Sequence, residues 1–181
     1  MDEAKGYRNN MCKPSERDST EKDIVIRKYR PGDPSRVCYF YYKLFEQQYG
    51  FNGIVEKYFM EGMLDLFEDR EGSQMWLVER DGEIVGSIGI IKRGDRDAQL
   101  RWFGIDMFLQ GQGVGNKLMR IAMGFCKERG YKHVILWSID ILKSARHLYG
   151  KFGFILTETK PNHEWAPYPM IEEKWEYNEG V

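Results

Sequence analysis

The sequence has few cysteines and few histidines, and neither type is arranged as a disulfide framework or a metal site. Its three cysteines, Cys12, Cys38 and Cys126, lie far apart, are odd in number and form no CxxC pair. A disulfide-stabilised secreted protein is therefore not expected, and a reducing cytoplasm is the expected location. The three histidines do not stand at metal-ligand spacing from these cysteines, so no metal is predicted.

Long apolar runs and an excess of one charge are also missing. No window approaches the ~20 apolar residues that a membrane-spanning helix needs, and residues 1–23 contain no apolar core of a signal peptide. The 27 Lys and Arg residues nearly balance the 28 Asp and Glu residues, which leaves a formal charge of −1. Since a dedicated nucleic-acid binder normally has a basic excess, we expect a soluble protein with no nucleic-acid partner and no membrane.

The 181 residues are enough for one domain with a tail. Residues 1–23 are polar, mixed in charge and without a period, which predicts a flexible N-terminal arm. Residues 24–181 are predicted to form the folded domain. A domain of this length buries about 70% of the surface of its unfolded chain, so it needs no metal or disulfide to be stable.

Apolar periodicity predicts an α/β fold, with a mixed sheet and helices on both faces. The dipeptide at 81–82 is Asp-Gly, which favours a tight hairpin turn. Asp33 is expected to cap the first helix, with Pro34 at its first position. The expected strands cover residues 24–29, 74–80, 83–92, 98–107, 133–138, 154–159 and 170–177, and the expected helices cover 35–50, 53–67, 114–130 and 142–152.

A glycine-rich segment stands between the strand expected at 98–107 and the helix that follows it. Glycines leave backbone N–H groups open to an anion, and a helix start adds unpaired N–H groups and a positive dipole end. The segment is therefore predicted to hold a pyrophosphate, with Lys117 and Arg120 near enough to add positive charge. Its residues are Gln110, Gly111, Gln112, Gly113, Val114 and Gly115.

Two common phosphate-binding motifs do not fit this segment. A Walker A loop and a dinucleotide fingerprint, both counted from Gly111, require a glycine where Asn116 stands. The spacing that fits is Gln-x-x-Gly-x-Gly, formed by Gln110, Gly113 and Gly115. Taken alone, phosphate binding is balanced by a plain strand-to-helix turn with extra glycines.

A second motif decides between these alternatives. Residues 144–154 read SARHLYGKFGF, which is similar to the A-x-x-L-Y-x-x-x-G-F element of the GNAT superfamily of N-acetyltransferases. The glycine segment resembles the [Arg/Gln]-x-x-Gly-x-[Gly/Ala] signature of the same family, in the same order along the chain. The resemblance covers roughly residues 24–177. It implies a largely antiparallel sheet of about seven strands with a splayed central pair, about four helices on both faces, and acetyl-CoA as cosubstrate.

A closer resemblance is to the acetyltransferase half of fusions that carry an N-terminal winged-helix regulator, through segments such as AQLRWFGID and EEKWEYN. Residues 1–23 are fewer than a DNA-reading helix bundle needs, so DNA binding is not expected. The chain departs from the family pattern at four positions: Leu142 stands where asparagine is common, Met107 where proline is common, and Tyr41 and Gln48 where closer relatives have a histidine and an acidic residue.

The resemblance implies direct transfer of an acetyl group to a primary amine. Backbone groups of Ile105 and Met107 are expected to bond the pantetheine arm as an added strand does, and the Ile105 N–H to polarise the thioester carbonyl. Tyr149 is the expected acid for the leaving thiolate. Periodicity alone favours a different interpretation of Tyr149, as a buried aromatic on an apolar helix stripe with Ala145 and Leu148.

The base, the acceptor and the quaternary state, a homodimer included, are left open by the sequence. Glu46, Asp106 and Glu83 are available carboxylates, and each also fits a solvated surface position. The acceptor is an amine of a small molecule or a protein. Two other functions stay open: a non-catalytic acyl-CoA-binding module, and an interaction protein or residual regulator. Acceptor selectivity is expected around Tyr42, Phe45, Tyr49, His163 and Trp165, which also suit core packing.

Overall fold

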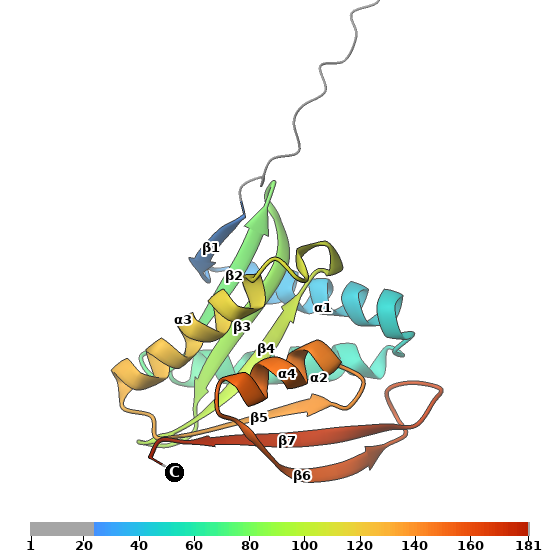
Figure 1. The fold of residues 1–181 in the computed structure, drawn as a ribbon. Helices are drawn as coiled ribbons and strands as arrows, with labels where there is room; N and C mark the ends of the chain where they lie inside the picture. Colours follow the sequence, from blue (N-terminus) through green and yellow to red (C-terminus); the bar gives the residue numbers. More distant parts are fainter. Residues whose placement is uncertain (1–23, 181) are drawn as a thin grey trace, which may run out of the picture.

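The computed structural model describes residues 24–180, and the arm expected at 1–23 lies outside them. The described residues form one sheet with helices on both faces (Figure 1). In chain order the elements are β1 (Val25–Lys28), α1 (Asp33–Tyr49), α2 (Ile54–Glu68), β2 (Gln74–Arg80), β3 (Glu83–Lys92), β4 (Asp97–Ile105), the 3-10 helix η1 (Met107–Leu109), α3 (Val114–Arg129), β5 (His133–Ile139), α4 (Lys143–Lys151), β6 (Ile155–Asn162) and β7 (Met170–Asn178).

The sheet has seven strands in the order β1-β2-β3-β4-β5-β7-β6. Every neighbouring pair is antiparallel except β4 and β5, which are parallel. These two central strands pair only where residues 97–99 face residues 133–135. Beyond this short ladder they separate, so the expected largely antiparallel sheet with a splayed central pair is confirmed.

The hairpin between β2 and β3 forms at the expected dipeptide. Asp81 and Gly82 both have left-handed backbone angles, with φ of 51° and 82°. Two consecutive positive φ angles are typical of the type I′ turn, whose twist matches that of the strands it joins. The hairpin places β3 antiparallel to β2.

Three expected element features are wrong, and one of them is the end of β6, which lies at Asn162, three residues past the expected position. The strand expected to run to Met107 ends at Ile105, because the side chain of Asp106 accepts a hydrogen bond from Phe108 N–H and starts η1. Asp33 does not cap α1: Gly32 precedes the helix, and Asp33 is its first residue.

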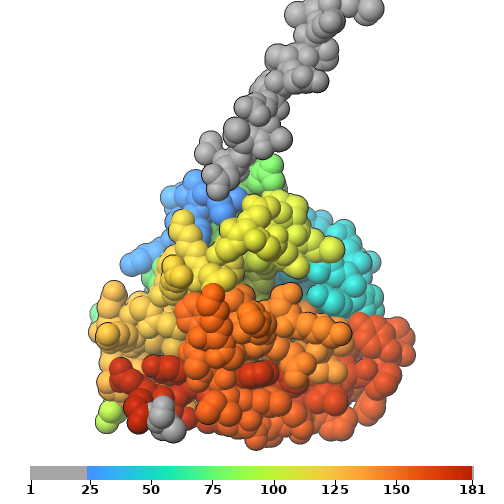
Figure 2. Space-filling view, in the orientation of Figure 1, coloured from blue at the N-terminus to red at the C-terminus, as the bar shows by residue number. Residues whose placement is uncertain are grey.

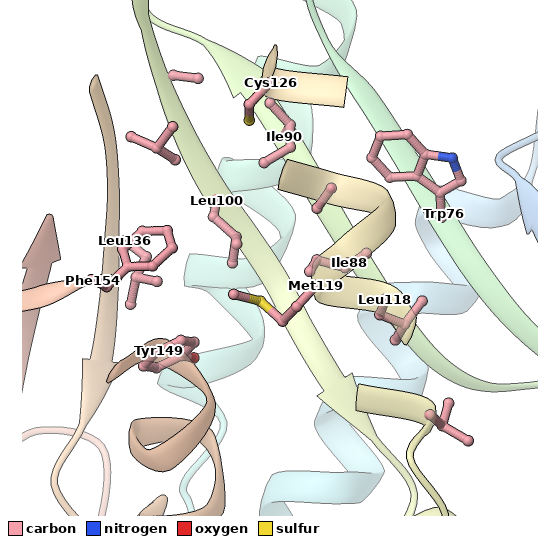
Figure 3. Packing of buried hydrophobic residues seen from close by; sticks show 14 of the residues in the cluster. Trp76, Ile88, Ile90, Leu100, Leu118, Met119, Cys126, Leu136, Tyr149 and Phe154 are labelled. Carbon is pink, nitrogen blue, oxygen red and sulfur yellow. The ribbon is translucent and has the colours of Figure 1, made fainter. Parts of the chain in front are cut away.

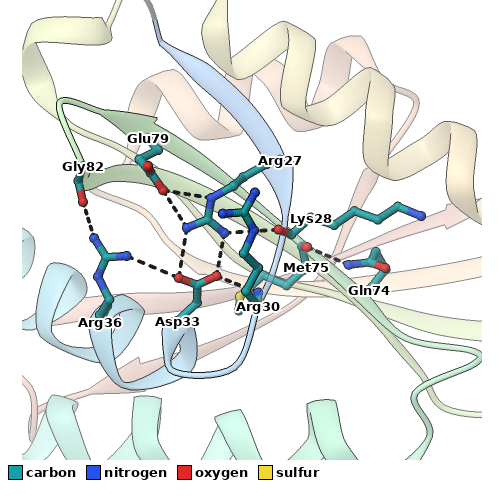
Figure 4. Close-up of polar contacts among 9 residues, drawn as sticks. All are labelled: Arg27, Lys28, Arg30, Asp33, Arg36, Gln74, Met75, Glu79 and Gly82. Carbon is teal, nitrogen blue, oxygen red and sulfur yellow. Dashed lines mark hydrogen bonds and ion pairs between the residues drawn. The ribbon is translucent and has the colours of Figure 1, made fainter.

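The carboxylate of Asp33 instead joins β1 to α1 (Figure 4). Arg27 donates to Asp33 over 2.6 and 3.0 Å and to Glu79 over 2.8 and 2.6 Å, while Arg30 N–H donates to Asp33 over 2.7 Å. Burial by itself raises the pKa of Asp33, yet these hydrogen bonds hold it below the usual value. A carboxylate engaged in this way has no free lone pair directed at the helix start.

The core lies on both faces of the central strands. On one face β3, β4 and β5 pack against α3 and α4 through residues such as Ile88, Leu100 and Leu118 (Figure 3). On the other face α1 and α2 pack against β2 and β3. A smaller third cluster joins α2 to the C-terminal strands, and it consists of Phe51, Val55, Ile139, Ala166 and Met170.

Candidate active site

An irregularity in β4 lies just beyond the point where β4 and β5 stop pairing. The ladder between β3 and β4 shifts register between Ser87 and Gly89, and Trp102 opposite has a φ of 49°, a rare angle for a bulky residue. A Cβ added to Gly89 would come within 2.5 Å of the Trp102 ring, so glycine is needed there. This bulge bends β4 away from its parallel neighbour.

A buried hydrogen-bond chain stabilises the bulge. The hydroxyl of Ser87 donates to the Trp102 carbonyl over 2.7 Å, and the hydroxyl of Tyr41 lies 3.0 Å from Ser87 Oγ. Because serine has only one hydroxyl proton, Tyr41 is the donor of the second bond. Both side chains are buried, which connects α1 directly to the point where the sheet opens.

The backbone of Ile105 faces the open side of β4. Asp106 N–H donates to Val85 carbonyl over 2.8 Å, so it points toward β3. Backbone groups alternate sides along a strand, and the N–H of Ile105 therefore points toward the separated β5. Met107 is different, because its carbonyl accepts from Gln110 N–H over 3.0 Å within η1 and its side chain is exposed. The Met107 carbonyl thus already accepts one hydrogen bond, which leaves its N–H as the more open of the two groups.

The glycine segment forms the turn that starts α3. Gly111 and Gly113 have φ of 76° and 79°, and a Cβ added to either would meet no atom of residues 24–180 within 4 Å. No side chain of the described chain caps α3, and its first turn has no acidic residue. The first N–H groups of a helix have no intrahelical partner. They and the positive dipole end are thus available to an anion.

The sequence did not predict a second helix start, that of α4, as part of the site. It differs from the start of α3 in that its first N–H, of Lys143, donates to the Ile141 carbonyl over 2.9 Å. Leu142 precedes α4, no side chain within residues 24–180 caps it, and its first turn also lacks acidic residues. By contrast, the first turns of α1 and α2 contain Asp33 and Glu56. An uncapped, acid-free start after Leu142 was visible in the sequence, but its position facing the glycine segment was not.

The starts of α3 and α4 line one cavity of about 710 Å³, here called the glycine cavity. Figure 2 shows the loop after β4, α4 and α1 meeting on this face of the molecule. Among the residues expected to bind the cofactor, Met107 and Gln112 lie outside this lining. The lining includes Ile105, Gln110, Gly111, Gly113, Val114 and Gly115, together with Lys143, Ser144 and Ala145 of α4.

A second cavity of about 790 Å³ lies on the other side of the opened strands and is here called the aromatic cavity. Three residues, Phe45, Phe103 and Leu142, line both cavities and mark their junction. Its aromatic lining consists of Tyr41, Phe45, Phe51, Tyr58, Phe59, Trp102, Phe103, Trp137, Tyr149 and Trp165. A ligand that spans the junction would thus touch backbone at one end and aromatic rings at the other.

Tyr149 belongs to the lining of the aromatic cavity and also packs in the core (Figure 3). Its ring centroid lies 6.1 Å from that of Phe103 and 5.8 Å from that of Trp175. Burial raises the pKa of Tyr149 to about 12, although the nearby Ser138 hydroxyl acts in the opposite direction. The phenol therefore keeps its proton at neutral pH and is a hydrogen-bond donor beside the junction.

The other expected residues are divided by the structure. His163 and Trp165 line the aromatic cavity, Tyr49 lines the glycine cavity, and Phe45 lines both. Tyr42 lines neither cavity, and neither do the three carboxylates considered as bases, Glu46, Asp106 and Glu83.

The helices and acidic clusters of the described chain add two findings. Between residues 24 and 180, none of the helices combines the length and apolar character that crossing a bilayer requires. In the same range, no group of His, Cys, Asp and Glu residues has the arrangement of a metal site.

The sequence matches the model of the acetyltransferase (GNAT) family over residues 38–154. It is 33% identical to human N-acetyltransferase 8B over 100 residues, which cover 52% of this chain and 44% of that protein. It is 28% identical to the probable N-acetyltransferase camello of Xenopus tropicalis over 109 residues, which cover 58% and 50%. The chain thus spans about half the length, or less, of these curated relatives.

Solved structures share the fold at low sequence identity. An acetyltransferase of the GNAT family from Staphylococcus aureus Mu50 superposes with a TM-score of 0.69 at 19% identity, covering 86% of this chain and 99% of that one. A putative phosphinothricin N-acetyltransferase superposes with a TM-score of 0.68 at 16% identity, covering 86% and 98%. At these identities the likeness is one of fold.

Proposed function

The chain belongs to the GNAT family of acetyltransferases, and from this membership we propose that it transfers an acetyl group from acetyl-CoA to a primary amine. The observation that carries the proposal is the glycine cavity, where two uncapped, acid-free helix starts face the same space. Such a space attracts a doubly charged diphosphate without any dedicated basic side chain. Lys143, at the start of α4, adds one positive charge to it.

The Ile105 N–H is the group proposed to bind the thioester carbonyl. Its direction toward the separated β5 supports this role, since a carbonyl placed between the strands accepts from it as a neighbouring strand would. When an amine attacks the carbonyl carbon, negative charge builds up on the oxygen, and a fixed N–H stabilises that charge. For Met107 we propose mainly an N–H contact with the arm, because its carbonyl already accepts from Gln110 N–H.

The transfer needs one new bond and one broken bond. The amine nitrogen bonds to the carbonyl carbon, the carbon–sulfur bond breaks, and the nitrogen loses a proton, which leaves an N-acetyl amine and CoA thiol. With a pKa of about 12, Tyr149 is a weaker acid than a thiol of about 8.5. We therefore propose that it donates a hydrogen bond to the developing thiolate rather than transferring its proton outright.

Calorimetry and a thiol-release assay test the proposal together. We expect saturable heat with CoA and with acetyl-CoA, and thiol release when amines are added. No heat with either ligand would remove the proposal altogether. Heat without thiol release on any amine would support the second candidate, a non-catalytic acyl-CoA-binding module that uses the same glycine cavity. We also propose that the chain is related to the acetyltransferase half of winged-helix fusions and that it is located in the cytoplasm.

A further inference from the structure

We infer that the acceptor amine is carried on an aromatic or similarly large apolar group, and that this group lies in the aromatic cavity. The inference rests on the proposed function, because it concerns the second substrate of the same reaction. Three features of the aromatic cavity indicate this class of substrate: its ring-lined wall, its paired charges and its junction with the glycine cavity.

The wall formed by α1 and α2 is a continuous set of rings. The ring of Tyr41 lies 4.6 Å from that of Phe59, and the ring of Phe45 lies 5.1 Å from that of Phe51 and 5.7 Å from that of Phe59. Phe45 and Phe59 are only partly buried, so part of their surface faces the cavity. Trp165, from the loop before β7, extends the same wall and lies 5.6 Å from the ring of Tyr58. Rings packed in this way offer a large apolar surface to a ligand.

The charged residues at this cavity are paired with other side chains of the protein. Glu172 accepts from Asn162 over 2.9 Å and lies 3.1 Å from Lys160. Arg101 donates to Asp65 over 2.7 Å.

Glu164, at the exposed rim, accepts from the Tyr58 hydroxyl over 3.2 Å. Among the described lining residues, Glu172 is paired with Lys160, and the one carboxylate without a charged partner, Glu164, lies at the rim. The cavity interior therefore offers no carboxylate to the second ammonium of a polyamine. Burying an unpaired charge is costly.

The junction explains how such an amine becomes reactive. An amine that reaches Phe45, Phe103 and Leu142 leaves water for an apolar surrounding, which disfavours its charged form. The neutral amine is the nucleophile, so the environment supplies part of what a general base would do. This agrees with the position of Glu46 and Asp106, which line neither cavity.

A matched set of amines tests the inference. At saturating acetyl-CoA we expect kcat/KM for 2-phenylethylamine to exceed that for 1,4-diaminobutane and for ethanolamine by roughly ten- to a hundredfold, the ratio that burial of one aromatic side chain supports. Equal or higher kcat/KM for the diamine or for ethanolamine would overturn the inference and leave acetyl transfer in place.

A variant pair on one helix adds a structural control. Tyr58 and Phe67 both lie on α2 and are 41% and 44% exposed, but only Tyr58 lines the aromatic cavity. Tyr58→Ala is expected to lower kcat/KM for 2-phenylethylamine about threefold to tenfold and to leave the KM for acetyl-CoA unchanged. Phe67→Ala is expected to change neither. Equal effects of both variants would count against an acceptor role for this wall.

Direct binding separates the inference from the proposed function. If no amine releases CoA thiol, acetyl transfer fails, and the fluorescence of Trp137 and Trp165, which line the cavity, then tests the inference alone. A saturable change with 2-phenylethylamine but not with 1,4-diaminobutane supports it. A change with the diamine alone, or with neither amine, overturns it.

Discussion

The two cavities that meet at Phe45, Phe103 and Leu142 are built from different parts of the polypeptide. The glycine cavity lies at two helix starts and has four glycines in its lining, whereas the aromatic cavity is lined mainly by large side chains of the helices and C-terminal strands. A diphosphate can be held by N–H groups that nearly every residue has, provided that side chains stay small. An acceptor must be selected by side chains. In the glycine cavity, substitutions that add side-chain atoms should therefore weaken acetyl-CoA binding. In the aromatic cavity, substitutions that remove side-chain atoms should weaken binding of the acceptor.

The largest effect is expected from Tyr149→Phe, since Tyr149 lies beside the junction of the two cavities. Loss of the hydroxyl removes the hydrogen-bond donor to the developing thiolate, and turnover is expected to fall about a hundredfold or more. The affinity for CoA is expected to stay within about twofold, as measured by calorimetry. Tyr168→Phe, on an exposed loop tyrosine, is the matched control. Unchanged turnover in Tyr149→Phe would remove this residue from the reaction.

The next effect comes from the hydrogen-bond chain that supports both cavities at the bulge. Ser87→Ala leaves the buried Tyr41 hydroxyl without its acceptor, and the free energy of unfolding is expected to fall by about 1–3 kcal/mol. Tyr41→Phe is expected to cost less, because Ser87 still donates to Trp102. Urea unfolding of the two variants compares them directly. The reverse order of destabilisation would contradict the assigned donor directions.

A smaller effect is expected from adding atoms to the glycine cavity. A Cβ on Gly115 would lie 3.0 Å from the Leu148 side chain, whereas one on Gly124, also on α3, would meet no atom of residues 24–180 within 4 Å. Gly115→Val is expected to weaken acetyl-CoA binding about tenfold by filling the cavity. Gly124→Ala is expected to leave binding unchanged and to stabilise the protein by about 0.5–1 kcal/mol. Unchanged affinity in Gly115→Val would contradict the claim that acetyl-CoA binding depends on small side chains in the glycine cavity.

The smallest effect is expected on stability, at the end of β4 and β5 where the two strands still pair. His133 lies 3.1 Å from Asp97 and 2.8 Å from Glu176, and a ring that donates to two carboxylates is protonated. The hydrogen bond with Glu176 raises the pKa of His133, and Lys174 and His133 lower that of Glu176 to about 2. The contribution of protonated His133 to the free energy of unfolding is fully present below about pH 6.5. It is lost as pH rises through the folded-state pKa of His133.

Thermal unfolding between pH 6 and pH 9 measures this loss. Because His133 is partly exposed, the change is expected to stay within the roughly 0–1 kcal/mol of surface ion pairs. His133→Gln is expected to flatten the pH dependence, while Lys174, which also pairs with Glu176, remains charged throughout this range. An unchanged slope in His133→Gln would assign the pH dependence to other groups.

The sequence predicted most of the fold because its signals are local. Strands β2 and β3 lie at the expected residues, since the Asp81-Gly82 turn and the flanking apolar runs need no distant partner. The end of β4 was missed by two residues, because Asp106 starts η1 with its own side chain. Asp33 was misassigned because its main partner, Arg27, comes from β1 and also donates to Glu79 of β2.

By itself, the sequence determined which segments become helices and strands, and that residues 110–115 form a glycine turn at a helix start. These features follow from apolar periods and from glycine's access to positive φ, which are properties of neighbouring residues. Only the tertiary structure decided that the start of α4 faces that turn, and that Tyr41 meets Ser87 across 46 residues of chain. Such contacts depend on how the sheet opens at Trp102, and no local pattern encodes the direction of that opening.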